Sequence, residues 1–388
     1  MPCDGNKMKF LKALCAVGFL VVLVSNILSI SGWNEIRGVY DDICYLRQAH
    51  LFQKFGPGGL DTDISGDDDH YLSARLKEID FPTWSDPTTA PCHTLMPATN
   101  RLVIQYPPGT GFVLALFPSG FQVIPLYVLA SVVAFGFALL AIAYTSTIFS
   151  LMLVAAFGDA VIYLMINPTK ASYSMAPTMM VCALAGFLTA KFFVDAGRRQ
   201  LVLTMLIGLL LGLAVNFRVA NLFLASGYGL FFLVSFLLSR NRETLLQGFL
   251  FGVAFAAGVA PTLLANAINA GSPFSTTYGG VDVAPPELNS GVLWSYFADV
   301  QFVLLVIAGA WTALILRLRH RSGMTEVAAV IAGNLVVNLI FFMTHPVFTP
   351  YYTIPVAMLS LWTLLFATLM PQREAIGDSL AFRQPVKA

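Results

Sequence analysis

Residues 201–239 read LVLTMLIGLLLGLAVNFRVANLFLASGYGLFFLVSFLLS, and Arg218 is the single charged residue in this stretch. The apolar run on either side of Arg218 is close to the roughly 20 residues that an α-helix needs to cross a bilayer. Asn216 and Asn221 flank the arginine, and polar residues between apolar runs indicate a turn. The stretch therefore predicts a tight hairpin of two short membrane helices with Arg218 at its tip.

The whole chain has the same apolar character. Of its 388 residues, 57% are hydrophobic and 11% are charged, whereas soluble domains carry about a quarter charged residues. A soluble fold of this composition would lack polar surface. We therefore predict an all-α polytopic membrane protein of about ten transmembrane helices, with residues 1–388 forming a single transmembrane domain. The predicted spans are 13–31, 122–142, 148–166, 173–194, 201–216, 219–238, 244–268, 296–316, 326–343 and 351–369.

Basic residues orient these spans, because cytoplasmic loops retain Lys and Arg. Lys7, Lys9 and Lys12 precede the first span. If the chain has ten spans, the short arginine-containing loops of its later part lie on the same side of the membrane as these lysines. We therefore expect a bacterial inner-membrane protein with both termini in the cytoplasm. Its active face is then periplasmic, where the loops 32–121 and 269–295 lie.

The first outer loop, 32–121, carries 11 of the 21 acidic residues and is expected to contain short juxtamembrane helices. Its first candidates for chemistry are the adjacent Asp41 and Asp42. Paired carboxylates near a bilayer suit a general base or a metal site, because low dielectric and mutual repulsion favour uptake of a proton by one of them. The alternative is that one of them caps a short helix lying on the membrane.

A second acidic cluster, residues 61–72, reads DTDISGDDDHYL. Its first six residues match the D-x-D-x-S-G opening of a calcium-binding loop, but Leu72 stands where that loop needs a bidentate glutamate. Further carboxylates follow at Asp67, Asp68 and Asp69. The cluster is thus an alternative location for the catalytic carboxylate or for a divalent metal. Otherwise it is a solvated loop that caps a helix over 71–78.

Three cations in separate turns are predicted on the outer face: Lys170, Arg218 and His345. A lipid-linked phosphate would lie at this depth, and cationic side chains make strong charge-assisted hydrogen bonds to its oxygens. Snorkelling toward lipid headgroups explains any one of them alone. We expect at least one to bind a donor phosphate. Tyr106, in the turn QYPPGTGF over 105–112, is a candidate for lining the substrate entrance.

The outer loop also holds Cys44 and Cys92, which an oxidising compartment would allow to pair as a disulfide. Two separate thiols are the alternative. Nucleic-acid binding has no support, since no basic run with interleaved aromatics occurs outside the spans. The sequence also lacks a Walker-type phosphate loop, a G-x-S-x-G elbow and an H-E-x-x-H zinc motif. Nucleotide-driven chemistry is therefore unsupported.

Taken in order, these features resemble the GT-C superfamily of integral-membrane glycosyltransferases, which includes protein O-mannosyltransferases, aminoarabinose lipid A transferases and lipopolysaccharide-core transferases. The motifs that carry the resemblance are the acidic pair after the first span, Tyr106-Pro107-Pro108, Asn167-Pro168, Phe217-Arg218, Gly271-Ser272-Pro273-Phe274, and His345 with Tyr351-Tyr352. The resemblance implies transfer of a sugar from a polyprenyl-phosphate carrier to an envelope glycan, lipid or protein acceptor at the outer face of the membrane.

The resemblance also implies roles for particular residues. A first-loop aspartate is the base or a metal-linked activator, with Asp42 preferred over Asp41, and Tyr351 joins Tyr106 in lining the substrate. No cofactor is specified beyond the option of a divalent metal. The competing interpretation is a flippase or transporter of lipid-linked sugar. Transporters commonly show paired broken helices and internal repeats, and the sequence shows neither.

Overall fold

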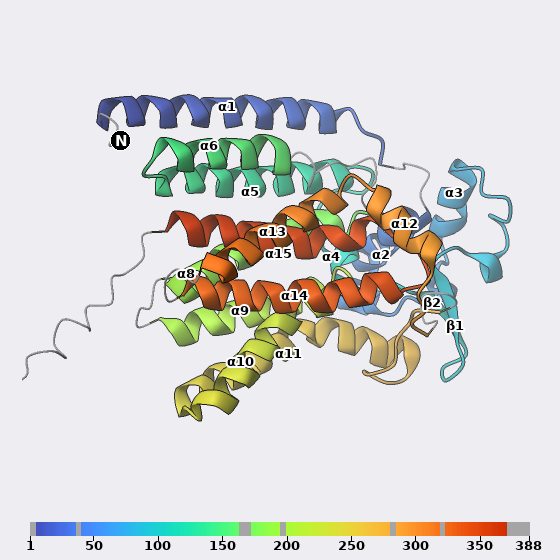
Figure 1. Ribbon diagram of the computed structural model, residues 1–388. Helices are drawn as coiled ribbons and strands as arrows, with labels where there is room; N and C mark the ends of the chain where they lie inside the picture. The colour runs from blue at the N-terminus through green and yellow to red at the C-terminus, as the bar shows by residue number, and fades with distance from the viewer. Residues whose placement is uncertain are drawn as a thin grey trace, which may run out of the picture.

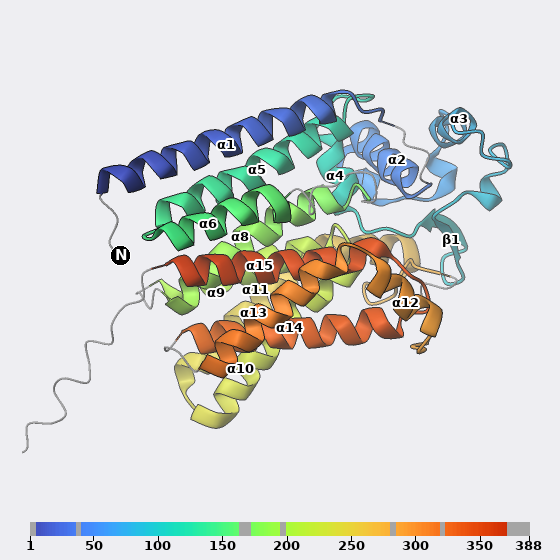
Figure 2. The same ribbon diagram turned by 45° about the horizontal axis from the view of Figure 1, so that its top comes forward.

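The computed structural model describes residues 5–35, 40–162, 172–194, 199–279, 285–318 and 323–370. In this part of the chain, long apolar helices lie side by side. The short helices and strands of the first outer loop gather beyond one end of this helix bundle (Figures 1 and 2). The one sheet of the described chain has two strands of four residues each. The predicted all-α fold is confirmed.

Six helices of the described chain are long and apolar enough to cross a bilayer. They are α1 (Gly5–Ser31), α5 (Val123–Tyr144), α8 (Met175–Val194), the continuous η6 and α10 (Val219–Ala225 and Ser226–Ser239), α11 (Arg242–Ala270) and α14 (Met324–Thr344). Three other predicted spans form shorter apolar helices: α6 (Ile148–Ala156, continued by the π-helical η4, Phe157–Val161), α9 (Gln200–Val215) and α15 (Thr353–Leu369). The number of ten crossings stays a prediction.

The predicted span 296–316 is not one straight helix. It divides into α12 (Ser290–Ala298) and α13 (Phe302–Leu318), which are bent by 83° relative to each other. The Asp299 carboxylate accepts a hydrogen bond from the Gln301 N–H at 2.8 Å, which starts the second helix in a new direction. Counted as one span, this pair would be a seventh candidate crossing.

Helix α15 lies at the centre of the bundle and is apolar all round, as expected for a helix with neighbours on every side. It packs against α8, α13 and α14. Trp362 is fully buried there, beside Gly186 of α8. A Cβ atom at Gly186 would come within 2.7 Å of the Trp362 side chain, so the close approach of α8 and α15 requires glycine.

The predicted turn at Arg218 is present between α9 and the continuous η6 and α10, although α9 packs mainly on α11, and a side-chain amide fixes this turn to α11. Asn216, at the end of α9, donates to the Gly258 carbonyl at 2.7 Å and accepts from the Thr262 N–H at 2.9 Å. These two backbone groups lie one turn apart in α11, beside Pro261, where a proline disrupts the helical hydrogen-bond ladder. The amide therefore ties the turn that carries Arg218 to the middle of α11.

The first outer loop forms a cap of short elements. It contains α2 (Tyr40–Phe55), the 3-10 turns η1 (Gly56–Leu60), η2 (Ile64–Gly66) and η3 (Pro87–Thr89), α3 (Tyr71–Glu78) and α4 (Gly109–Ala115). The helix predicted over 71–78 is confirmed. Strands β1 (His93–Met96) and β2 (Arg101–Ile104) pair antiparallel, with His93 opposite Ile104, and were not predicted. Gly109 donates its N–H to the Asn216 carbonyl at 2.7 Å, which joins the cap to the Arg218 hairpin.

Candidate functional site

The carboxylate of Asp41 accepts hydrogen bonds from two tyrosine hydroxyls. Tyr106, just before α4, donates to Oδ1 at 2.6 Å, and Tyr351 donates to Oδ2 at 3.2 Å. Tyr351 belongs to η8 (Pro350–Tyr352), the short turn before α15. The first outer loop and the last loop of the chain thus meet at one carboxylate.

Both tyrosine bonds fall on Asp41, whereas the family resemblance favoured Asp42. The two residues lie in the first turn of α2, where consecutive side chains point in different directions around the helix axis. Asp42 is 1% exposed, and Asp41 is half-buried and reaches the tyrosines. Asp41 is therefore the carboxylate that the fold presents to the site.

Arg218 stands beside the same tyrosines. Its guanidinium carbon lies 4.2 Å from the ring centre of Tyr351 and 4.5 Å from that of Tyr352. Contacts of this kind attract a cation to the electron-rich ring face. Among the described residues, no carboxylate lies within ion-pair distance of this guanidinium. Its charge is thus available to an incoming anion.

His345 is the second of the three predicted cations to reach this place. Its ring is buried and lies 5.4 Å from Phe341 and 5.6 Å from Tyr352, measured between ring centres. Tyr352 therefore contacts both Arg218 and His345, as expected if the two turns share one membrane depth. Lys170 lies outside the described residues.

Two further tyrosines complete an aromatic wall that sequence reasoning missed. Tyr45 stacks on Tyr106 with ring centres 4.9 Å apart, and Tyr278 meets the edge of Tyr106 at 6.0 Å. Tyr45 stands four residues after Asp41, so helical periodicity could have placed it on the same face. Tyr278 comes from the second outer loop, which is held by a hydrogen bond from the Thr277 hydroxyl to the Gln105 carbonyl at 2.8 Å.

The phenols around Asp41 stay protonated. Burial raises the pKa of Tyr106, and the negative charge of Asp41 raises it further. Burial also raises the pKa of Tyr351 to about 12, although the nearby Arg218 opposes the shift. Both hydroxyls therefore remain hydrogen-bond donors to the carboxylate at physiological pH.

The alternative acidic cluster is engaged with basic residues of the cap. Asp68 pairs with Lys54, and Asp69 accepts from the His50 ring nitrogen at 2.7 Å. Asp67 accepts the Leu72 N–H at 3.1 Å, which caps α3 as the solvated-loop interpretation expects. These contacts fix the fold of the loop, and none of them points to the tyrosine cluster.

A divalent-metal site has little support in the described part of the chain. The single set of three potential ligands that come together there is Cys44, Cys92 and His93. The two cysteines form a disulfide, with Cα atoms 6.5 Å apart, and His93 accepts from the Arg47 guanidinium at 2.7 Å. A buried arginine cation at that ring nitrogen opposes binding of a second cation.

The disulfide lies next to the candidate site. Cys44 follows Asp41 by three residues in α2, and the Cys92 carbonyl accepts from the Gln105 N–H at 2.9 Å. Tyr106 is the next residue in the chain. The bond between the cysteines therefore ties the helix that carries Asp41 to the strand end that carries Tyr106.

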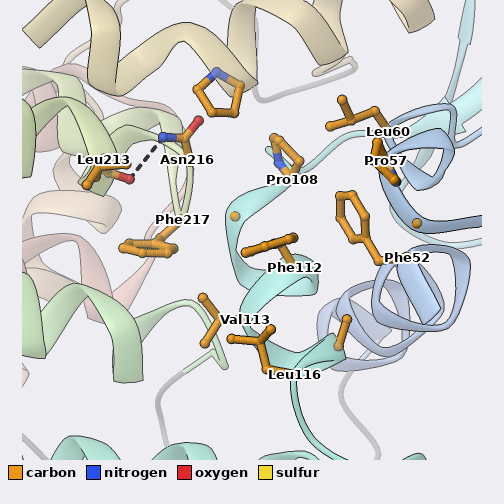
Figure 3. Close-up of a pocket in the computed structure, with 14 residues that line it drawn as sticks. Phe52, Pro57, Leu60, Pro108, Phe112, Val113, Leu116, Leu213, Asn216 and Phe217 are labelled. Carbon is orange, nitrogen blue, oxygen red and sulfur yellow. Dashed lines mark hydrogen bonds between the residues drawn. The ribbon is translucent and has the colours of Figure 1, made fainter.

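An apolar cavity of about 600 Å³ opens beside the polar cluster. Pro108 and Gly109, just after Tyr106, and Asn216 and Phe217, just before Arg218, belong to its wall. Figure 3 shows these residues with Phe52, Phe112 and Leu116 around the cavity. Its remaining lining residues are Gly56, Pro57, Leu60, Val113, Ala115, Leu213 and Pro261. Apart from Asn216, every lining side chain is apolar, so the cavity suits a hydrocarbon chain.

Comparisons with protein-family models, with curated proteins and with solved structures give no match to this chain. Its function is therefore argued from the geometry of the site.

Proposed function

We propose that this protein is a membrane glycosyltransferase of the GT-C type, which transfers a sugar from a polyprenyl-phosphate donor to an envelope acceptor. One observation carries the proposal: a hydrogen-bonded carboxylate, Asp41, and a guanidinium without a carboxylate partner in the described chain, Arg218, contact the same tyrosine beside an apolar cavity. The carboxylate suits activation of the acceptor, the guanidinium suits binding of the donor phosphate, and the apolar cavity suits the lipid tail of the donor.

In this proposal Asp41 is the general base. A carboxylate offers about four acceptor positions, and the two tyrosine hydroxyls occupy two of them. Asp41 takes the proton of the acceptor hydroxyl while the acceptor oxygen forms a bond to the anomeric carbon of the sugar. The bond from that carbon to the phosphate oxygen breaks, and polyprenyl phosphate leaves with the electron pair.

Arg218 and His345 act on the leaving phosphate. A guanidinium presents several N–H donors in a planar fork that matches phosphate oxygens. Cations held in place before the reaction stabilise charge as it develops on a leaving group. The Tyr351 and Tyr352 rings fix the position of Arg218 without neutralising it, so its charge acts on the phosphate.

The donor tail is assigned to the apolar cavity between α2, α4, α9 and α11. The wall of this cavity includes Pro108, two residues after Tyr106, and Phe217, next to Arg218, so a chain inside it would leave its phosphate near the guanidinium. The predicted ten spans complete the proposal, because a chain with that topology has its site at the periplasmic face of a bacterial inner membrane and both termini in the cytoplasm.

The proposal is tested in cells and with purified protein. Envelope glycans from cells with the wild-type chain, with Asp41→Asn and without the chain are compared by mass spectrometry. The wild type should add the mass of one sugar residue, and the other two should lack it. Native mass spectrometry of the detergent-purified protein should show binding of undecaprenyl phosphate but not of undecaprenol, which lacks the phosphate.

The same material distinguishes a transferase from a flippase. Protein in liposomes is given undecaprenyl-phosphate glucose on one side, and movement of the lipid and loss of its sugar are both followed. Release of undecaprenyl phosphate that requires an added acceptor extract supports transfer. Lipid movement with the sugar still attached would refute it.

A further inference from the structure

Helix α12 leaves the bundle at a sharp angle to α13. The bend of 83° means that, where α13 crosses a bilayer, α12 lies close to the membrane plane. Figure 1 shows α12 at the end of the bundle where the first outer loop gathers. The helix therefore lies beyond one end of the long helices and turns sharply away from α13.

The outward side of α12 is apolar. Trp294 is 74% exposed and Phe297 is 57% exposed, and the nine residues SGVLWSYFA include no charge. Positions three apart share one face of a helix, so the two aromatic rings project together. Val303 and Val306 of the adjoining α13 are also exposed. Exposed apolar side chains therefore occur on both helices of the bent pair.

The inward side of α12 packs on the segment that carries part of the candidate site. The ring of Tyr296 lies 4.8 Å from that of Phe348, between ring centres, and its hydroxyl accepts from the Thr349 N–H at 3.2 Å. Just before the helix, Glu287 donates its N–H to the Thr344 carbonyl at 2.7 Å. Helix α12 thus packs on Phe348 and Thr349, just before the turn of Tyr351.

We propose that α12 is a membrane-surface helix whose partner is the outer lipid leaflet. Trp294 and Phe297 insert among the headgroups, where tryptophan is enriched because its ring has an apolar body and a polar N–H. An interfacial helix buries its apolar face by about 5–10 Å. The lipid surface then holds Tyr296 against Phe348 and Thr349 and so supports the turn of Tyr351 that follows them. This inference does not depend on sugar transfer.

Tryptophan fluorescence tests the proposal directly. The wild type and Trp294→Phe are reconstituted in nanodiscs of ordinary phosphatidylcholine or of phosphatidylcholine brominated on the acyl chains near the headgroup. The difference between the two proteins is the emission of Trp294. We expect brominated lipid to remove most of this emission and aqueous iodide to leave it nearly unchanged.

Trp84 is the matched control, since it lies in the first outer loop, is 39% exposed and has the Lys77 ammonium 5.0 Å from its ring centre. The difference between wild type and Trp84→Phe should respond to iodide and not to brominated lipid. Quenching of Trp294 by iodide alone would overturn the proposal. Protection from both quenchers would also overturn it, because it would mean that a protein partner and not lipid covers Trp294. If Trp294→Phe does not fold, Phe297→Trp should add an emission that brominated lipid removes.

Discussion

The hydroxyl of Tyr106 lies 2.6 Å from Oδ1 of Asp41, which joins the turn before α4 to the first turn of α2. Hydrogen bonds to an ionised carboxylate are roughly twice as strong as neutral ones and have lengths near this value. Because the pKa of Tyr106 is raised by burial and by the charge of Asp41, the phenol keeps its proton and the bond persists. One carboxylate oxygen is therefore held in a fixed direction at the candidate site.

Replacing Asp41 by Asn should abolish most of the transfer activity. The amide keeps the size of the side chain but cannot accept a proton from the acceptor, and loss of a general base costs about 10²–10⁴-fold in rate. The measurement is release of undecaprenyl phosphate from undecaprenyl-phosphate glucose with an acceptor extract. Asp42→Asn is the matched control, expected to keep far more activity. If Asp41→Asn keeps a rate within a few-fold of wild type, a residue other than Asp41 is the general base.

Tyr106→Phe should lower the rate while the protein stays folded. The change removes one hydrogen bond to a charged group, worth about 1.5–3 kcal/mol, which corresponds to roughly 10- to 100-fold in rate. The aromatic ring and its stacking on Tyr45 are kept. Tyr278→Phe retains Asp41's two hydroxyl donors and is the control. Equal effects of the two changes would mean that the Tyr106 hydroxyl has no special role.

Arg218→Gln should weaken binding of undecaprenyl phosphate and lower transfer by roughly 100-fold, because a fixed donor to the developing phosphate charge is lost. Arg218→Lys should fall between wild type and Gln, since it keeps the charge but loses the planar fork and the stacking on Tyr351 and Tyr352. Native mass spectrometry measures the binding. Unchanged binding of undecaprenyl phosphate by the Gln variant would show that Arg218 does not bind the phosphate.

The meeting of Arg218 and His345 could be predicted from sequence, whereas the choice between Asp41 and Asp42 could not. Charge bias and span number predict both cations at one membrane depth, and in the structure both contact Tyr352. The orientation of α2 has no such signal, because residues 42–49 are all buried, including Arg47 and Gln48. Without an exposed stripe, hydrophobic periodicity does not show which aspartate faces the site.

Two further differences have local causes. The break between α12 and α13 lies in an apolar run, where Asp299 and Gln301 are the only polar residues between the helices, so composition alone suggested one span. Strands β1 and β2 are four residues long and pair through a short turn. Their alternation is too brief to distinguish from an irregular loop. The start of α3, by contrast, follows from the Asp67 carboxylate, which accepts a hydrogen bond from the Leu72 N–H in its first turn.

Breaking the Cys44–Cys92 disulfide should loosen the cap and slow transfer. The bond closes a loop of 48 residues between α2 and the start of β1, and removing a disulfide of this kind typically costs about 2–4 kcal/mol. We expect Cys44→Ser with Cys92→Ser to lower the thermal midpoint and the rate together. Thiol alkylation with and without reductant measures the bond itself. Ready alkylation of both cysteines before reduction would show that the bond is not formed.

His93 should make the cap less stable in mild acid. Burial, together with the positive charge of the adjacent Arg47 guanidinium, lowers its pKa to about 3. The unfolded chain takes up a proton near pH 6.5, the ordinary value for histidine, whereas the folded chain keeps His93 neutral. Between these pH values the unfolded state binds more protons, so the free energy of unfolding falls as pH decreases from about 6.5 toward 3.

His93→Gln should remove this part of the pH dependence, because glutamine can still accept from Arg47 but does not titrate. Thermal midpoints of the protein in detergent at pH 7.5, 6.5, 5.5 and 4.5, roughly spanning the upper part of that window, test the expectation. The wild type should lose more stability toward acid than the variant. His70→Asn, at an exposed position of the same loop, should behave like the wild type. Parallel curves for wild type and His93→Gln would mean that His93 takes up its proton in the folded protein, which contradicts its burial against a guanidinium.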